Sequence, residues 1–260
     1  MKRIMLTVAY DGTDYCGWQI QPTGLSVEEV LNRALTRLLG EDIRVLGTSR
    51  TDSGVHSLGN LCVFDSDTRI PPEKICFALN ERLPDDIVIL RSEEVPADFH
   101  PRKCDSIKTY EYTVWHSRLP NPIERRTSYF FYMRLDVARM RKAAAYLVGE
   151  HDFKSFCSAR TQVESTVRRI TCLEIREDGP RIVFHIEGTG FLYNMVRIIV
   201  GTLLRIGTGL WEPERIAQIL QARDRQAAGP KVPPQGLVLK EIRLYPEGYP
   251  AQLQGGEDDE

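Results

Sequence analysis

The sequence predicts an α+β fold whose N-terminal half is a ferredoxin-like unit. Several short segments alternate between apolar and polar residues, which is the pattern of half-buried strands. Other segments carry an apolar stripe with helical spacing. Over the N-terminal half these elements follow the order strand, helix, strand, strand, helix, strand, which is typical of a ferredoxin-like unit. The 260 residues suffice for two modest domains or one large domain.

The first half contains both kinds of element in close succession. Ser26 and Glu29 form a capping box at the start of the first helix, and Gly40 ends it. The predicted elements of this half are strands at residues 3–10, 43–46, 60–64 and 87–90, and helices at 26–39 and 71–82.

The second half shows the same mixture of strands and helices. Asp136 is placed to cap one of its helices. The segment 191–206 is apolar on nearly all sides, which predicts a buried helix. The predicted elements of this half are strands at 107–115, 182–186 and 237–244, and helices at 136–148, 191–206 and 212–220.

The composition is that of a soluble globular protein, with 42% hydrophobic and 27% charged residues. The longest apolar stretch, residues 191–204, is too short to span a membrane and contains Arg197. The N-terminus lacks the apolar region of a signal peptide, so we expect a cytoplasmic protein. Neither the six cysteines nor the five histidines have the spacing of a disulfide framework or of a metal site.

The charge is nearly balanced overall but is basic in one region. A net charge of −2 argues against a generally basic nucleic-acid binder. The last four residues are all acidic, which leaves +2 for residues 1–256. Residues 102–126 hold six Lys and Arg against three acids, and such local charge is sufficient to bind a phosphate backbone.

One loop presents an acid among small residues. The stretch LGTSRTDSGVHS, residues 46–57, places Asp52 between two apolar runs, and Gly54 permits a positive φ. Local chemistry alone favours an Asx-turn, in which Asp52 bonds its own backbone. The alternative is that the loop presents the carboxylate to a ligand.

Two further features sit in the second half. Arg197 lies in the predicted helix 191–206, which is apolar on nearly all sides. We therefore expect Arg197 to be buried and to need a carboxylate partner. Tyr110 and Tyr112 share one face of a predicted strand. Such a pair is usually part of a core, although a phenol beside a basic segment can also stack on a nucleobase.

The stretch around Asp52 closely resembles the GRTDAGVHA signature of the tRNA pseudouridine synthase A family, whose acid is catalytic. The resemblance covers nearly the whole chain, in order, through at least five segments. These segments are YDGTDYCGWQIQP at 10–22, FHPRKCDSIKTYEY at 99–112, HDFKSF at 151–156, FLYNMVRIIVG at 191–201 and PPQGLVLKEIRLY at 233–245.

The resemblance implies roles for four residues. Asp52 matches the catalytic aspartate, and Arg197 matches the active-site arginine that pairs with it. Tyr110 matches the active-site tyrosine, which would stack on the uracil. Arg50 would help to displace the base from its stack.

The resemblance also implies the fold, the reaction and the assembly. The family fold is two α/β halves joined through a largely antiparallel central sheet, with the active-site cleft between them. The family converts uridines of the tRNA anticodon stem-loop, at tRNA positions 38, 39 and 40, to pseudouridine. It works as a homodimer without a cofactor or metal. The expected division is residues 1–101, residues 102–248 and a disordered acidic tail, 249–260.

The chain departs from the family pattern in two places. Lys103, Cys104 and Asp105 stand where Phe-Ser-Ala is usual, and Ile198 stands where Asn is usual. The first departure puts local substrate contacts in question. The second changes a neighbour of the arginine and leaves its charge in place.

Two other classes of protein fit parts of the sequence. A non-catalytic RNA-binding protein would also use the basic segment and the tyrosine pair, but it needs no buried ion pair. A glycosyl hydrolase generally uses two acids, and no second acid shares the loop context of Asp52. The presence of Asp52, Tyr110 and Arg197 together favours the synthase.

Overall fold

The computed structural model describes residues 1–158 and 163–250. The chain divides into two compact units, one formed by Met1–Ser106 with Leu239–Glu260 and the other by Ile107–Val238. We call them the first unit and the second unit. Residues 251–260, which make up most of the expected acidic tail, lie outside the described residues.

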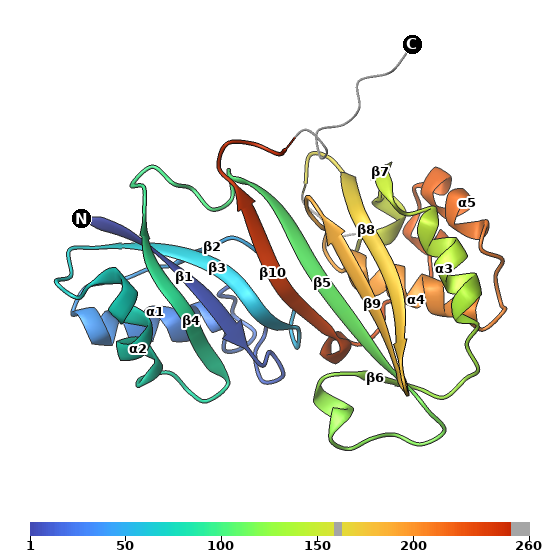
Figure 1. Cartoon of the computed structure of the whole chain (residues 1–260), viewed down its shortest axis with the longest axis horizontal. Coiled ribbons are helices and arrows are strands. Elements are labelled where there is room, and N and C mark those ends of the chain that lie inside the picture. Colours follow the sequence, from blue (N-terminus) through green and yellow to red (C-terminus); the bar gives the residue numbers. More distant parts are fainter. Residues whose placement is uncertain (159–162, 251–260) are drawn as a thin grey trace, which may run out of the picture. The chain divides into compact units, whose positions relative to one another are not determined.

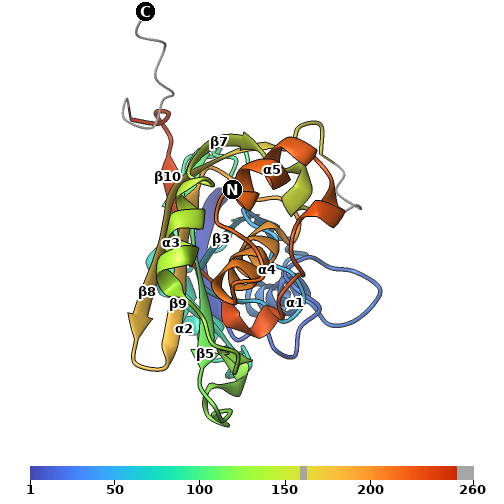
Figure 2. The same ribbon diagram turned by 90° about the vertical axis from the view of Figure 1, so that its right-hand side faces the viewer.

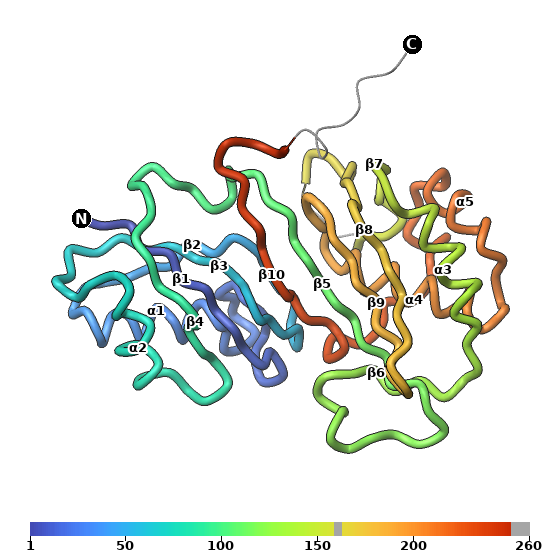
Figure 3. Tube along the Cα trace, viewed as in Figure 1, coloured from blue at the N-terminus to red at the C-terminus, as the bar shows by residue number. Residues whose placement is uncertain are grey.

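The first unit is built on antiparallel strands. They are β1 (Lys2–Tyr10), β2 (Leu46–Gly47), β3 (His56–Ser66), β4 (Ile87–Val95) and β10 (Leu237–Tyr245). Their order is β4-β1-β3-β10, and β2 pairs with β3 (Figure 1). The register places Arg3 opposite Asp65 and Tyr10 opposite Ser57. Figure 3 follows the chain of this unit from β1 through α1 to β3 and back along β4.

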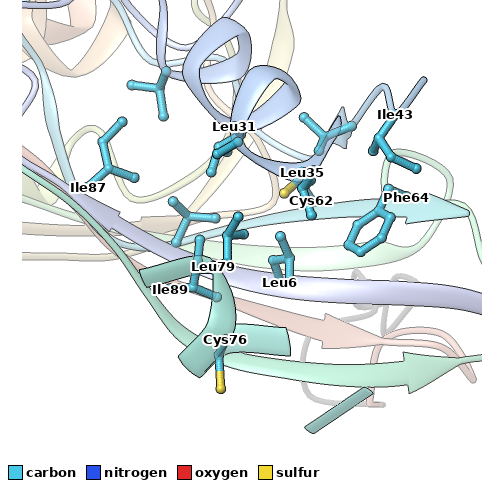
Figure 4. Close-up of a cluster of buried hydrophobic side chains, with 14 of the residues drawn as sticks. Leu6, Leu31, Leu35, Ile43, Cys62, Phe64, Cys76, Leu79, Ile87 and Ile89 are labelled. Carbon is cyan, nitrogen blue, oxygen red and sulfur yellow. The ribbon is translucent and has the colours of Figure 1, made fainter. Parts of the chain in front are cut away.

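The helices of the first unit are α1 (Val27–Leu39) and α2 (Ile75–Asn80), the second preceded by the 3₁₀ turn η1 (Pro72–Lys74). The ends of α1 are confirmed, because the Ser26 hydroxyl accepts the Glu29 N–H and Gly40 is left-handed at φ 72°. Figure 4 shows Leu31 and Leu35 of α1 lying over Leu6 and Cys62 of the strands. This packing buries the apolar face of β1 completely.

The predicted strand at residues 43–46 is much shorter in the structure, where β2 has two residues. The cause is visible in its hydrogen bonds. The Ile43 N–H donates to Thr36 Oγ1 at 3.2 Å, and the Val45 N–H donates to Asn32 Oδ1 at 2.8 Å. These backbone groups are satisfied by side chains of α1 rather than by a neighbouring strand.

The second unit contains strands β5 (Asp105–His116), β6 (Tyr129–Phe131), β7 (Gly149–Asp152), β8 (Val167–Asp178) and β9 (Arg181–Gly188). Their order is β5-β9-β8-β7, and the short β6 runs parallel to β5. The helices are α3 (Val137–Ala145), α4 (Met195–Gly207) and α5 (Arg215–Ala222). Figure 2 shows α4 and α5 on the same side of β8 and β9.

Helix α4 is buried all round, as its composition predicts, with Arg205 the one exposed residue of its length. It begins at Met195 rather than at Phe191 because Asn194 adopts a left-handed conformation at φ 63°. Ile198 is fully buried, so the apolar residue that replaces the family's usual Asn fits its surroundings. Among the described residues no helix has the length and apolar character needed to cross a membrane.

The Arg3–Asp65 pair predicts an acid-sensitive contribution to stability. Arg3 donates to both carboxylate oxygens, from Nε at 2.8 Å and from Nη2 at 2.7 Å, and this bond holds the pKa of Asp65 below its ordinary value. A carboxyl with a depressed folded pKa stabilises the protein above its unfolded pKa of ~3.9, and the contribution disappears as the pH falls through the folded pKa.

Asp65→Asn should therefore flatten the dependence of the unfolding free energy on pH below about 5, with a change of ~1 kcal/mol or less for this partly exposed pair. Urea denaturation at a series of pH values measures it. Asp85→Asn, at an exposed position of the same unit, is the control. Identical pH profiles for the Asp65 variant and the control would contradict the prediction.

Candidate active site

The loop between β2 and β3, residues 48–55, carries Arg50 and Asp52. The Arg50 side chain is exposed, and Asp52 is half-buried. The Val55 N–H donates to the Asp52 carbonyl at 3.1 Å, and Gly54 adopts a positive φ of 76°, which glycine permits. Asp52 is therefore the first residue of a tight turn within this loop.

This loop is fastened to the segment that follows β1. The Trp18 N–H donates to the Thr51 carbonyl at 3.1 Å, and the Gly54 N–H donates to the Tyr15 carbonyl at 3.3 Å. Gly17 lies at φ 110°, and a Cβ at this position would approach the Thr51 carbonyl oxygen to 2.6 Å. The glycine lets the two backbones lie in contact.

Buried polar side chains hold the same loop from beneath. The Tyr10 hydroxyl lies 2.7 Å from Thr51 Oγ1, and Asn60 Nδ2 donates to the Ser49 carbonyl at 3.0 Å and to the Tyr10 hydroxyl at 3.4 Å. Sequence reasoning missed Asn60. Asn60 is fully buried in β3, and its signal in the sequence is an amide directly before the apolar run at residues 61–64.

Arg197 lies on the first turn of α4 with 6% of its surface exposed, which confirms the predicted burial. Its Nε donates to the Val232 carbonyl at 2.9 Å, and its Nη1 donates to Asn194 Oδ1 at 3.0 Å. Asn194 in turn donates from Nδ2 to Ser158 Oγ at 2.7 Å. These two acceptors fix the direction of the guanidinium.

The two tyrosines of β5 differ in their surroundings. Tyr112 is fully buried, donates to the Pro233 carbonyl at 2.8 Å, and has its pKa raised by burial against the opposing charge of Arg197. Tyr112 is therefore a packing residue, placed near the arginine. The Tyr110 ring packs edge-on against Phe191 with centroids 5.2 Å apart.

The structure thus brings the predicted residues together in two sets. Arg50 and Asp52 share one loop of the first unit, and Arg197 lies near the tyrosine strand of the second unit. Among residues 1–158 and 163–250, no group of three or more His, Cys, Asp or Glu side chains is arranged to hold a metal ion.

Comparison with known proteins identifies the class to which this fold and site belong. A family described as tRNA pseudouridine synthase matches residues 6–102 and 143–246. The chain belongs to this family.

Several curated relatives carry the name tRNA pseudouridine synthase A. The chain is 46% identical to the one from Clostridium acetobutylicum, over 93% of this chain and 99% of the relative. It is 48% identical to that of Ruminiclostridium cellulolyticum over 93% and 99%, and 42% identical to that of Myxococcus xanthus over 100% and 98%. Among solved structures, a Cbf5-Nop10-Gar1 complex matches with a TM-score of 0.38 and 13% identity over 92% of this chain and 47% of that chain, which supports no conclusion about this chain.

The contact at Gly17 predicts a measurable effect on the Asp52 loop. Gly17→Ala would place a methyl group against the Thr51 carbonyl and would strain the backbone, so the loop must shift. We expect the unfolding free energy to fall by more than the ~1–2 kcal/mol of a left-handed alanine alone. Pseudouridine formation should fall with it.

Gly40→Ala is the matched control, since Gly40 also has a positive φ but nothing lies within 4 Å of the added Cβ. Urea denaturation and an activity assay on both variants separate backbone strain from displacement of the loop. Equal stability and equal activity in the two variants would show that the Gly17 contact does not position Asp52.

Proposed function

We propose that this protein isomerises uridine to pseudouridine in the anticodon stem-loop of tRNA, at tRNA positions 38, 39 and 40. The observation that carries the proposal is the half-buried Asp52, held in a supported loop within the family's motif. The relatives that match nearly the whole chain are named for the same activity.

The reaction suits an ionised carboxylate. The N1–C1′ bond of the uridine breaks, the uracil turns, and a C5–C1′ bond forms, while C5 loses a proton and N1 gains one. Asp52, as an anion beside the sugar, would assist the exchange of bonds at C1′. We propose that the reaction uses the chain's own side chains, without a cofactor or metal.

We further propose that Arg197 pairs with Asp52 in the working enzyme. Arg197 is buried, and a buried guanidinium is costly unless an opposite charge lies near it. A guanidinium beside a carboxyl favours the ionised form of the carboxyl. The pair would keep Asp52 anionic at neutral pH.

Tyr110 and Arg50 would handle the base. A uracil stacked in the RNA cannot be turned, so the nucleotide has to leave its stack before the bonds exchange. The exposed Arg50, two residues from Asp52, would help to displace it. Tyr110, paired edge-on with Phe191, would stack on the uracil.

The finer features of the architecture belong to the same proposal. We propose that both halves are ferredoxin-like, a proposal supported by the order β4-β1-β3, with β2 on β3, in the first unit and by the order β5-β9-β8 in the second. We propose that residues 1–101 and 102–248 form two halves with the active-site cleft between them. We also propose that the enzyme acts in the cytoplasm as a homodimer, as its family resemblance implies.

Asp52→Asn should abolish turnover while tRNA binding stays within about tenfold, or ~1.4 kcal/mol, because the change removes a charge but hardly alters shape. Release of tritium from tRNA carrying 5-tritiated uridine measures turnover, and filter binding measures affinity. Asp42→Asn, at an exposed position of the same unit, is the control and should keep full activity. Substantial tritium release by the Asp52 variant would refute the assignment.

The proposed ion pair predicts coupling between Asp52→Asn and Arg197→Met. Each single change strands one charge, whereas the double change strands none, so the double variant should lose less stability than the sum of the two. A urea double-mutant cycle measures the coupling, expected at about 1–3 kcal/mol. Arg205→Met, at the exposed position of α4, serves as the uncoupled control. If the losses of unfolding free energy from the two single changes simply add, Asp52 and Arg197 do not form the proposed pair.

A further inference from the structure

Arg102 is fastened to the base of the Asp52 loop, although it lies far away in sequence. Its Nε donates to the Gly47 carbonyl at 2.8 Å. Gly47 is the last residue of β2, three residues before Arg50. The bond uses one of the nitrogens of the guanidinium, and the terminal nitrogens Nη1 and Nη2 remain for another acceptor.

The turn that carries Arg102 is built from backbone groups around one histidine. The Arg102 N–H donates to His100 Nδ1 at 3.2 Å, and the His100 carbonyl accepts the N–H groups of Lys103 at 3.0 Å and of Cys104 at 3.2 Å. Lys103 and Cys104 contribute backbone donors, which any non-proline residue supplies. The unusual side chains at this point therefore leave the placement of Arg102 intact.

The charges of Arg102 and Arg50 lie near each other. Burial, and then the positive charge of Arg50, lower the pKa of Arg102, while Glu28 opposes the shift. Both arginines keep exposed surface, although the Nε bond of Arg102 is partly buried, and within the described part of the chain neither belongs to an ion pair. Two like charges held together in this way favour the binding of an anion.

The group that best fits two guanidinium forks is a phosphate. Arginine binds phosphate through two parallel N–H···O bonds, and the Gly47 bond orients the Arg102 fork in advance. We propose that Arg102 and Arg50 together form a binding site for one phosphate of the RNA backbone, next to the nucleotide that reacts at Asp52. This site rests on the proposed function, since it assigns RNA as the ligand.

The proposal assigns different tasks to the phosphate site and to Asp52. The phosphate contact would hold the backbone of the RNA while the base leaves its stack, because a fixed phosphate gives the nucleotide a pivot. Arg102 would act on binding rather than on the exchange of bonds.

Arg102→Gln tests the site without removing its anchor. The Gln Nε2 can occupy the place of the Arg Nε and donate to the Gly47 carbonyl, while the charge and the terminal nitrogens are lost. Binding of tRNA should weaken about tenfold, and the slope of log Kd against log salt should fall by about 1. The matched control is Arg82→Gln, at an exposed arginine of the same unit that also donates to a backbone carbonyl.

Binding is measured by filter assay in the Asp52→Asn background, so the result does not depend on turnover. In that background Arg102→Gln and Arg50→Gln should be less than additive if both arginines hold one phosphate.

Unchanged affinity and an unchanged salt slope for Arg102→Gln would overturn the phosphate site. A loss seen with Arg102→Ala but not with Arg102→Gln would overturn it too, since Arg102 would then only brace Gly47. Inactivity of the parent chain would refute the proposed function, a result distinct from either of these.

Discussion

The fastening of the 48–55 loop to the segment after β1 is the constraint on which the rest of the candidate site depends. Thr51, the residue before the acid, is held twice, by the Trp18 N–H at its carbonyl and by Tyr10 at its hydroxyl. The contact leaves no room for a side chain at Gly17. The position of Asp52 is therefore set by strand β1 and the segment after it rather than by the loop's own residues. These contacts hold a short loop in one defined position.

Arg197 meets a second constraint, the cost of placing a charge in a helix that is buried on every side. Asn194 contributes in two ways. Its left-handed backbone makes α4 begin one turn later than the apolar pattern predicts, and its side-chain oxygen accepts a hydrogen bond from the guanidinium. The Val232 carbonyl supplies the second acceptor. These two bonds fix the direction of the guanidinium, which suits an arginine whose proposed task is to support a catalytic carboxylate.

The connector after β4 shows why a departure from a family motif can be harmless. Its turn is made by backbone N–H groups converging on His100, so the side chains of Lys103 and Cys104 are free to vary. Ile198 is a different case, because it is fully buried within α4 and an apolar side chain suits that position. In both places the structure preserves the arginine beside the substitution, Arg102 in one and Arg197 in the other.

The sequence by itself determined the α+β class and most of the helices and strands, and it provided the family motifs on which the proposed site residues rest. Local patterns can be recognised without knowledge of the fold. They include the cap at Ser26, the alternation along residues 3–10 and the apolar residues that flank Arg197 in its helix. Only the tertiary structure decided that residues 43–45 bond to side chains of α1, that Asn60 braces the loop, that residues 239–245 return to the first unit and that Arg102 reaches Gly47. Each of these contacts joins segments that are distant in sequence. A local pattern of polar and apolar residues does not show which backbone groups will lack a backbone hydrogen-bond partner and will bond to a distant side chain instead.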